Sequence, residues 1–258
     1  MGTGLRRGRA ERAEFRRTSL ITMAALSSNN LLSVWEQSAQ RHPIDRALLL
    51  FAIARPHTPP NNLADMPLGV RNAALMELRR NSFGEQLDAW LDCTKCGERL
   101  EFTIDPAQLP PPPSGNESLL DVAGHRFNHP TSRHMASLTN TTNPDDIALQ
   151  LMRECAESAE ELPQDAAALT ELLDAVDSAM EAADPWAELT LDIHCPACGQ
   201  EDSIAFDIAT YLWEEIDSHA RRLLDDIHTL AEAYGWSEPD ILALSDARRA
   251  AYLDRVLA

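Results

Sequence analysis

Apolar residues recur at helical spacing through most of this chain and alternate with polar residues in only a few short segments. Residues 31–54 contain two apolar runs, the first including Leu32 and Trp35 and the second including Ile44 and Leu48. These runs predict two short helices that contribute to a core. Helical spacing of apolar residues over 71–83 predicts a third helix.

Three arginines of this third helix fall outside its apolar positions. We expect Arg71, Arg79 and Arg80 to lie on a solvated face, which is where charged residues of a surface helix usually lie. The alternative is that they pair with acidic residues of the chain or with a partner.

The longest periodic segment runs from Ile208 to about residue 233 and predicts one long helix. Gly235 is expected to end this helix, because glycine readily adopts the left-handed conformation found after helix C-termini. Ser237 and the following Pro239 predict the start of a short helix, and residues 246–257 predict a last one. We interpret this C-terminal helical hairpin as a packing unit without a catalytic residue.

Two Cys-x-x-Cys-Gly sequences, Cys93/Cys96 and Cys195/Cys198, stand in matching surroundings. An apolar approach precedes each pair, and an alternating segment follows it. The approach residues are Leu87, Trp90 and Leu91, and then Leu189, Leu191 and Ile193; the alternating residues are Leu100, Phe102 and Ile104, and then Ile204, Phe206 and Ile208. This duplication predicts two zinc knuckles on short β-hairpins that share one metal, which is a zinc ribbon.

The spacing has a physical reason, because two intervening residues let both sulfurs reach one ion about 2.3 Å away. The glycine that follows each pair can take the positive φ that closes the turn. We therefore predict one structural Zn²⁺ bound by Cys93, Cys96, Cys195 and Cys198. Thiol redox chemistry and an absence of metal are the alternatives. A closed site of four cysteines leaves no open coordination position, which argues against metal catalysis.

About a hundred residues separate the knuckles, far more than in a compact zinc finger. The predicted fold is therefore α+β and mainly helical, with a split zinc ribbon and a long insertion. The expected divisions are a basic extension (1–30), N-terminal helices with the first knuckle (31–109), the insertion (110–185), and the second knuckle with the helical hairpin (186–258).

The insertion is expected to contain three kinds of structure. A Pro-rich turn is predicted at 110–115, and a strand-like stretch with a turn at 122–135. Acidic helices are predicted between 145 and 183, with Asn143 and Pro144 marking a helix start.

The formal net charge of −19 makes nonspecific binding to nucleic acid or to anionic membranes unfavourable. Basic residues are concentrated in residues 1–22, which hold six arginines and two acidic residues. We expect translation to begin at Met23, with a disordered basic extension as the alternative. No apolar run is long enough to span a membrane. Reduced cysteines and the lack of a secretory signal predict a cytoplasmic protein.

The remaining histidines and cysteine give little indication of a second metal site or of catalysis. His125, His129 and His134 are possible ligands of a second metal, but their spacing does not place them on one face, so we expect a surface role. Cys155 is expected to be a buried apolar group, and Glu154 beside it would raise its pKa. The chain contains no G-x-S-x-G, no phosphate-binding glycine loop and no H-E-x-x-H, so we predict that it is not an enzyme.

Several stretches resemble a known family. They are MPLGVRNAALMELRRNSFG, CTKCGERLEFTID, HRFNHPTSRHMASL and the segment from LWEEIDSHARRLL to the C-terminus. They are similar to the T4-type phage baseplate hub assembly chaperones over about residues 31–258. The resemblance implies a non-enzymatic role in building the baseplate of a contractile tail or a contractile injection system, with baseplate or hub proteins as partners. The alternatives are a zinc-ribbon regulator that binds nucleic acid and a thiol-disulfide protein.

Overall fold

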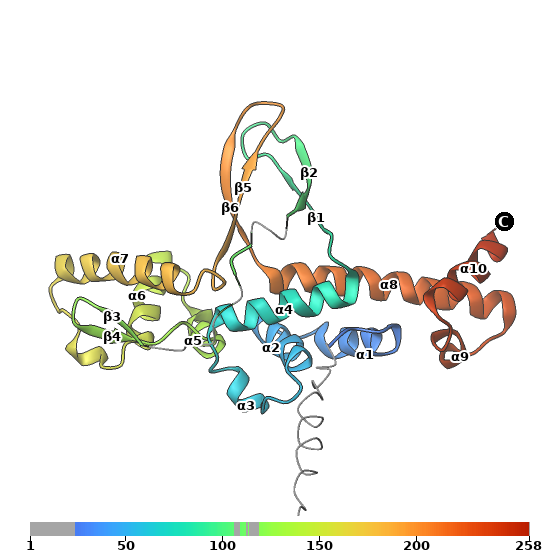
Figure 1. Ribbon diagram of the computed structural model, residues 1–258, viewed down its shortest axis with the longest axis horizontal. Coiled ribbons are helices and arrows are strands. Elements are labelled where there is room, and N and C mark those ends of the chain that lie inside the picture. The colour runs from blue at the N-terminus through green and yellow to red at the C-terminus, as the bar shows by residue number, and fades with distance from the viewer. Residues whose placement is uncertain (1–23, 106–108, 112, 114–118, 258) are drawn as a thin grey trace, which may run out of the picture.

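The computed structural model describes residues 24–257 except 106–108, 112 and 114–118 (Figure 1). The expectations for residues 1–23, including a start at Met23, lie outside the described residues, as does part of the predicted Pro-rich turn. Helices predominate, and the described strands form three separate two-stranded antiparallel sheets. The predicted α+β fold is confirmed.

Five helices form the body of the molecule. They are α1 (Ser28–Ser38), α2 (Pro43–Ala54), the short α3 (Pro60–Leu63), α4 (Leu68–Phe83) and α8 (Ile208–Tyr234). Helix α8 runs the length of the body, and α1, α2 and α4 pack along it (Figure 1). Fully buried apolar side chains from three of these helices meet in the core: Leu50, Phe51, Leu75, Leu78, Leu212 and Ile216. The three N-terminal helices expected from apolar spacing are confirmed.

Two β-hairpins project side by side from the body (Figure 1). One consists of β1 (Leu87–Asp92) and β2 (Arg99–Ile104), and the other of β5 (Leu189–His194) and β6 (Glu201–Phe206). The expected alternation through Ile208 is wrong at its end. The Asp207 side chain accepts a hydrogen bond from Ala209 N at 2.9 Å and starts α8, so Ile208 is a fully buried helical residue.

The segment between the hairpins forms a lobe with its own apolar core. Its elements are β3 (Leu120–Val122), β4 (His125–Phe127), α5 (Ser132–Ser137), the 3₁₀ turns η2 (Leu138–Asn140) and η3 (Ala159–Glu161), α6 (Pro144–Cys155) and α7 (Ala166–Ala183). Its buried residues include Val122, Phe127, Met152, Leu172 and Val176. The acidic helices expected here are confirmed, with Asn143 capping α6.

The strand-like stretch predicted for 122–135 is correct only as far as Phe127. Thr131 accepts a hydrogen bond from His134 N at 3.3 Å and so caps a helix over Ser132–Ser137. A capping threonine satisfies a free N–H at the helix start, and this local bond favours helix over an extended chain.

The C-terminal helices form at the far end of α8, as expected. Gly235 has φ +67° and ends α8 in the left-handed conformation. Helices α9 (Glu238–Leu242) and α10 (Asp246–Leu257) follow and pack back on α8. Ile241 is fully buried against Leu230 of α8, which anchors this end of the molecule.

The solvated face expected for the three arginines of α4 is wrong for Arg71 and Arg79. The Arg79 side chain is only 3% exposed, and its Nε and Nη2 donate to the carboxylate of Glu215 on α8 at 2.8 and 2.6 Å. Arg71 is half-buried and donates to Asn72 Oδ1 and Ser132 Oγ. Arg80 remains at the surface, where it pairs with Glu85. The packing of α8 on α4 buries Arg79, and Glu215 pairs with its charge.

Candidate metal centre

The two knuckles have the same backbone geometry. In the first, Cys93 N donates to Glu98 O at 2.8 Å and Gly97 N donates to Cys93 O at 2.9 Å. The second repeats these bonds with Cys195, Gln200 and Gly199 at the same distances. Gly97 and Gly199 have φ of +73° and +70°. A residue with a Cβ is strained in this conformation, so glycine closes both turns.

The structure brings the four predicted cysteines together at the ends of the two hairpins. Their sulfur atoms all lie within 4.8 Å of one another. Two contacts connect the knuckles: Cys93 Sγ to Cys198 Sγ and Cys96 Sγ to Cys195 Sγ, each 3.7 Å. A tetrahedral zinc ion with bonds of about 2.3 Å holds its sulfurs about 3.8 Å apart. The four residues therefore fit a tetrahedral metal site.

The pKa values of two neighbouring thiols in the cluster are shifted in opposite directions. Backbone hydrogen bonds from Cys96 and Lys95 lower the pKa of Cys93 to about 7. The backbone of Glu98 acts in the same direction on Cys96, but the Cys198 thiol, burial and the other two thiols outweigh it and raise the pKa of Cys96 to about 12. Crowded thiols resist full ionisation because their negative charges repel. A metal cation would remove this resistance and deprotonate its ligands.

Contacts around the sulfurs hold the two hairpins in register. Cys93 and Cys195 are buried and pack with Leu100, which is also buried, and with Leu91 and Ile193. Outside this apolar layer, Thr94 Oγ1 donates to Asp202 Oδ2 at 2.6 Å across the two knuckles. The site is therefore closed on its inner side, while Cys96 faces solvent.

The other candidate residues do not form a second metal site. Among the described residues, the group of four cysteines is the cluster in which three or more potential ligands converge. His134 is half-buried, with Nδ1 3.4 Å from Cys155 Sγ, so the surface role expected for it is wrong. Cys155 is fully buried, and burial and Glu154 raise its pKa to about 12, as expected. A raised pKa disfavours the thiolate, so Cys155 does not resemble an activated nucleophile.

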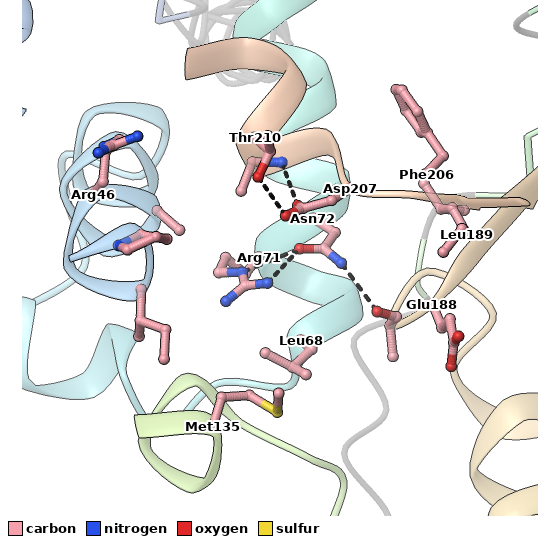
Figure 2. A pocket seen from close by; sticks show the side chains of 16 residues that line it. Arg46, Leu68, Arg71, Asn72, Met135, Glu188, Leu189, Phe206, Asp207 and Thr210 are labelled. Atoms are coloured by element: carbon pink, nitrogen blue, oxygen red, sulfur yellow. Dashed lines mark hydrogen bonds between the residues drawn. The ribbon is translucent and has the colours of Figure 1, made fainter. Parts of the chain in front are cut away.

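A cavity of about 270 Å³ lies where the body meets the second hairpin and α5 (Figure 2). Arg71, Leu68 and Met135 line it together with the start of α8. Figure 2 shows the Arg71 guanidinium beside Asn72, to whose Oδ1 it donates at 2.9 and 3.0 Å. Burial lowers the pKa of Arg71, and Asp207 acts in the opposite direction. The bond from Arg71 Nη1 to Ser132 Oγ, 3.0 Å long, joins the body to the lobe.

Trp90 lies at the surface of the first hairpin. The sequence predicts it beside Leu87 and Leu91 in the apolar approach to the knuckle, yet it is 62% exposed. The strand alternates, so Leu87, Ala89 and Leu91 face the core and Trp90 faces outward. Its position between two inward residues was the signal available in the sequence.

In the part of the chain that the structure describes, every helix is too short or too polar to cross a lipid bilayer. The helical body and the paired cysteine hairpins define an α+β protein with a ribbon-like four-cysteine centre.

Residues 49–213 match the model of the T4 bacteriophage base plate protein family, and the chain belongs to that family. The match includes both cysteine pairs and the lobe between them. No curated protein and no solved structure matches the chain. The family points to a structural role connected with the phage baseplate and to interaction with other baseplate proteins.

Proposed function

We propose that this protein is a non-enzymatic assembly factor or structural component of the baseplate of a phage-tail-like contractile injection system, and that it binds one structural Zn²⁺. The observation that carries the proposal is the family match, which extends over both cysteine pairs. The four sulfurs converge, and sulfurs of the two knuckles lie 3.7 Å apart, as around a tetrahedral zinc ion; this supports zinc as the bound metal.

Zinc at this site would have a mechanical role. The cysteines belong to hairpins whose contacting residues are 99 and 105 positions apart in the sequence. Metal binding contributes about 10–16 kcal/mol in zinc-finger peptides. A contribution of that kind would hold the two hairpins together as one projection from the helical body.

Protein binding would then carry the function, with baseplate or hub proteins as the partners. The net charge of −19 favours basic partner surfaces. The cytoplasm, where thiols remain reduced for metal binding, is the compartment we propose.

The alternative functions have weaker support. A nucleic-acid regulator would need a continuous basic surface, but the second hairpin carries the acidic Glu201 and Asp202 in the part that corresponds to Arg99 of the first. A thiol-disulfide protein needs one reactive pair, whereas here four sulfurs converge.

The proposal is tested by mixing the purified protein with each baseplate and hub protein encoded beside it, one at a time. We expect one zinc per chain by elemental mass spectrometry and a stable complex with at least one of these proteins by size-exclusion chromatography. A lack of any complex would overturn the proposed function. Gel analysis of purified particles then separates an assembly factor, which leaves, from a structural component, which remains.

A further inference from the structure

The two hairpins provide an internal comparison of what this fold requires. The sequences of the two knuckles align when Cys93 is matched with Cys195. Three residues before each first cysteine stand Trp90 in one hairpin and Asp192 in the other. Both face outward on strands with the same pairing. The second hairpin folds with an acidic residue at this position, so the fold alone does not account for an exposed tryptophan.

The indole of Trp90 is held in place and is nevertheless open to a partner. The Arg99 guanidinium lies over the ring, 4.1 Å from its centroid. Arg99 is also paired with Asp92 at 3.5 Å. Trp90 remains 62% exposed, the most exposed aromatic residue in the described chain. A side chain that is already ordered loses little entropy on binding, and tryptophan and arginine are common among residues that dominate protein interfaces.

Acidic residues surround this tryptophan on the same face of the hairpin. Asp88 and Asp92 flank it on β1, and Glu101 lies directly opposite on β2. All three are exposed. Arg99 is the basic residue on this face, and at the aligned position the second hairpin carries Glu201. The face therefore combines an apolar anchor with an acidic rim.

This combination selects the kind of partner. Nucleic acid would be repelled by the rim, and a second copy of the chain, with a net charge of −19, would be repelled as well. We propose that the outer face of the β1–β2 hairpin, centred on Trp90, is the docking surface for a protein partner that offers an apolar cavity with a basic rim. The inference rests on the proposed function and names the surface by which this protein would hold its baseplate partner.

The test compares Trp90→Asp, which introduces the residue of the equivalent position, with Leu257→Asp, which introduces aspartate at an apolar side chain of α10 that is 78% exposed. Binding of each variant to the purified baseplate partner is measured by calorimetry, with zinc content and thermal unfolding as controls. We expect Trp90→Asp to weaken binding by about 30-fold or more, since dominant interface residues have effects of this size. Leu257→Asp should bind like the wild type.

Salt and charge variants test the acidic rim. Glu101→Lys should weaken binding, and higher ionic strength should weaken the wild-type complex. Binding that is independent of salt would overturn the basic-rim assignment.

The outcomes separate the two proposals. If the wild type binds a baseplate protein and Trp90→Asp binds equally well, the docking surface is wrong and the proposed function stands. If no baseplate protein binds the wild type, the proposed function itself fails. A wild-type dimer that Trp90→Asp dissociates in sedimentation, or tight duplex DNA binding lost in that variant, would assign the face to a different occupant and overturn the inference.

Discussion

The carboxylate of Asp184 accepts a hydrogen bond from the backbone N–H of Gly69, with Oδ2 2.9 Å from the nitrogen. Gly69 lies in the first turn of α4, and Asp184 follows the last helix of the lobe. Both residues are buried. An acidic group at a helix N-terminus satisfies a free N–H and interacts favourably with the helix dipole. This contact fixes the returning chain against the body just before the second hairpin.

A side chain at residue 69 should disturb this contact. A Cβ added to Gly69 would lie 1.7 Å from Asp184 Oδ1, so Gly69→Ala forces the carboxylate to move. We expect a loss of about 1–3 kcal/mol in the free energy of unfolding, the usual range for overpacking a buried site. Urea denaturation measures the loss. The double variant with Asp184→Ala relieves the clash, so the two changes should be clearly non-additive; strictly additive losses would contradict the contact.

Removing one cysteine ligand should remove the metal and destabilise the hairpins. Cys96→Ser is expected to lower zinc from one per chain to none and to reduce the unfolding temperature, because the ion holds two distant segments together. Cys155→Ala is the matched control, since Cys155 is a buried thiol in the lobe and away from the sulfur cluster. Elemental mass spectrometry and thermal unfolding provide the measurements. Full zinc content in Cys96→Ser would contradict the assigned ligand set.

Breaking the ion pair between α4 and α8 should be costly. Arg79→Ala leaves Glu215 without its bidentate partner and removes the bond from Arg79 Nη1 to Gly84 O. Loss of one member of a buried pair costs about 3–5 kcal/mol, and we expect about 3 because Glu215 is partly exposed. Arg80→Ala is the control, because its pair with Glu85 lies at the surface and should contribute less than about 1 kcal/mol. Chemical denaturation measures both losses. Equal losses of unfolding free energy in Arg79→Ala and Arg80→Ala would contradict the importance of the burial of Arg79.

Acid should weaken the contact between α1 and α8. Hydrogen bonds from Arg221 and then Trp35 lower the pKa of Asp217 in the folded protein. A carboxyl group with a lowered folded pKa stabilises the protein above its unfolded pKa of about 3.9, and that stability is lost as the pH falls through the folded value. We expect the free energy of unfolding to fall below about pH 5.

Asp217→Asn tests the contribution of this carboxyl group. The amide cannot titrate, but it retains an oxygen that accepts the bond from Trp35 Nε1, which is 2.7 Å long in the wild type. The variant should be less stable at neutral pH and should lose less stability on acidification. Parallel stability curves for variant and wild type between pH 6 and about pH 3 would be the contrary result.

Much of the local structure could be predicted from neighbouring residues. Asn143 and Pro144 start α6, and Gly235 ends α8, because capping and left-handed turns depend on residues within one turn of the chain. The knuckles were predictable for the same reason, since spacing and the glycines at 97 and 199 define a tight turn locally. The strand-like stretch predicted for 122–135 is wrong beyond Phe127, because Thr131 caps a helix that begins at Ser132.

By itself, then, the sequence determined the long helical segments, the two cysteine hairpins and the identity of the four sulfurs that would meet. Tertiary structure alone decided that Arg79 is buried against Glu215 and that Asp184 caps α4. The physical reason is the distance in sequence between the residues that interact. Periodicity and turns depend on bonds between near neighbours, whereas the burial of a charge depends on which distant segment packs beside it.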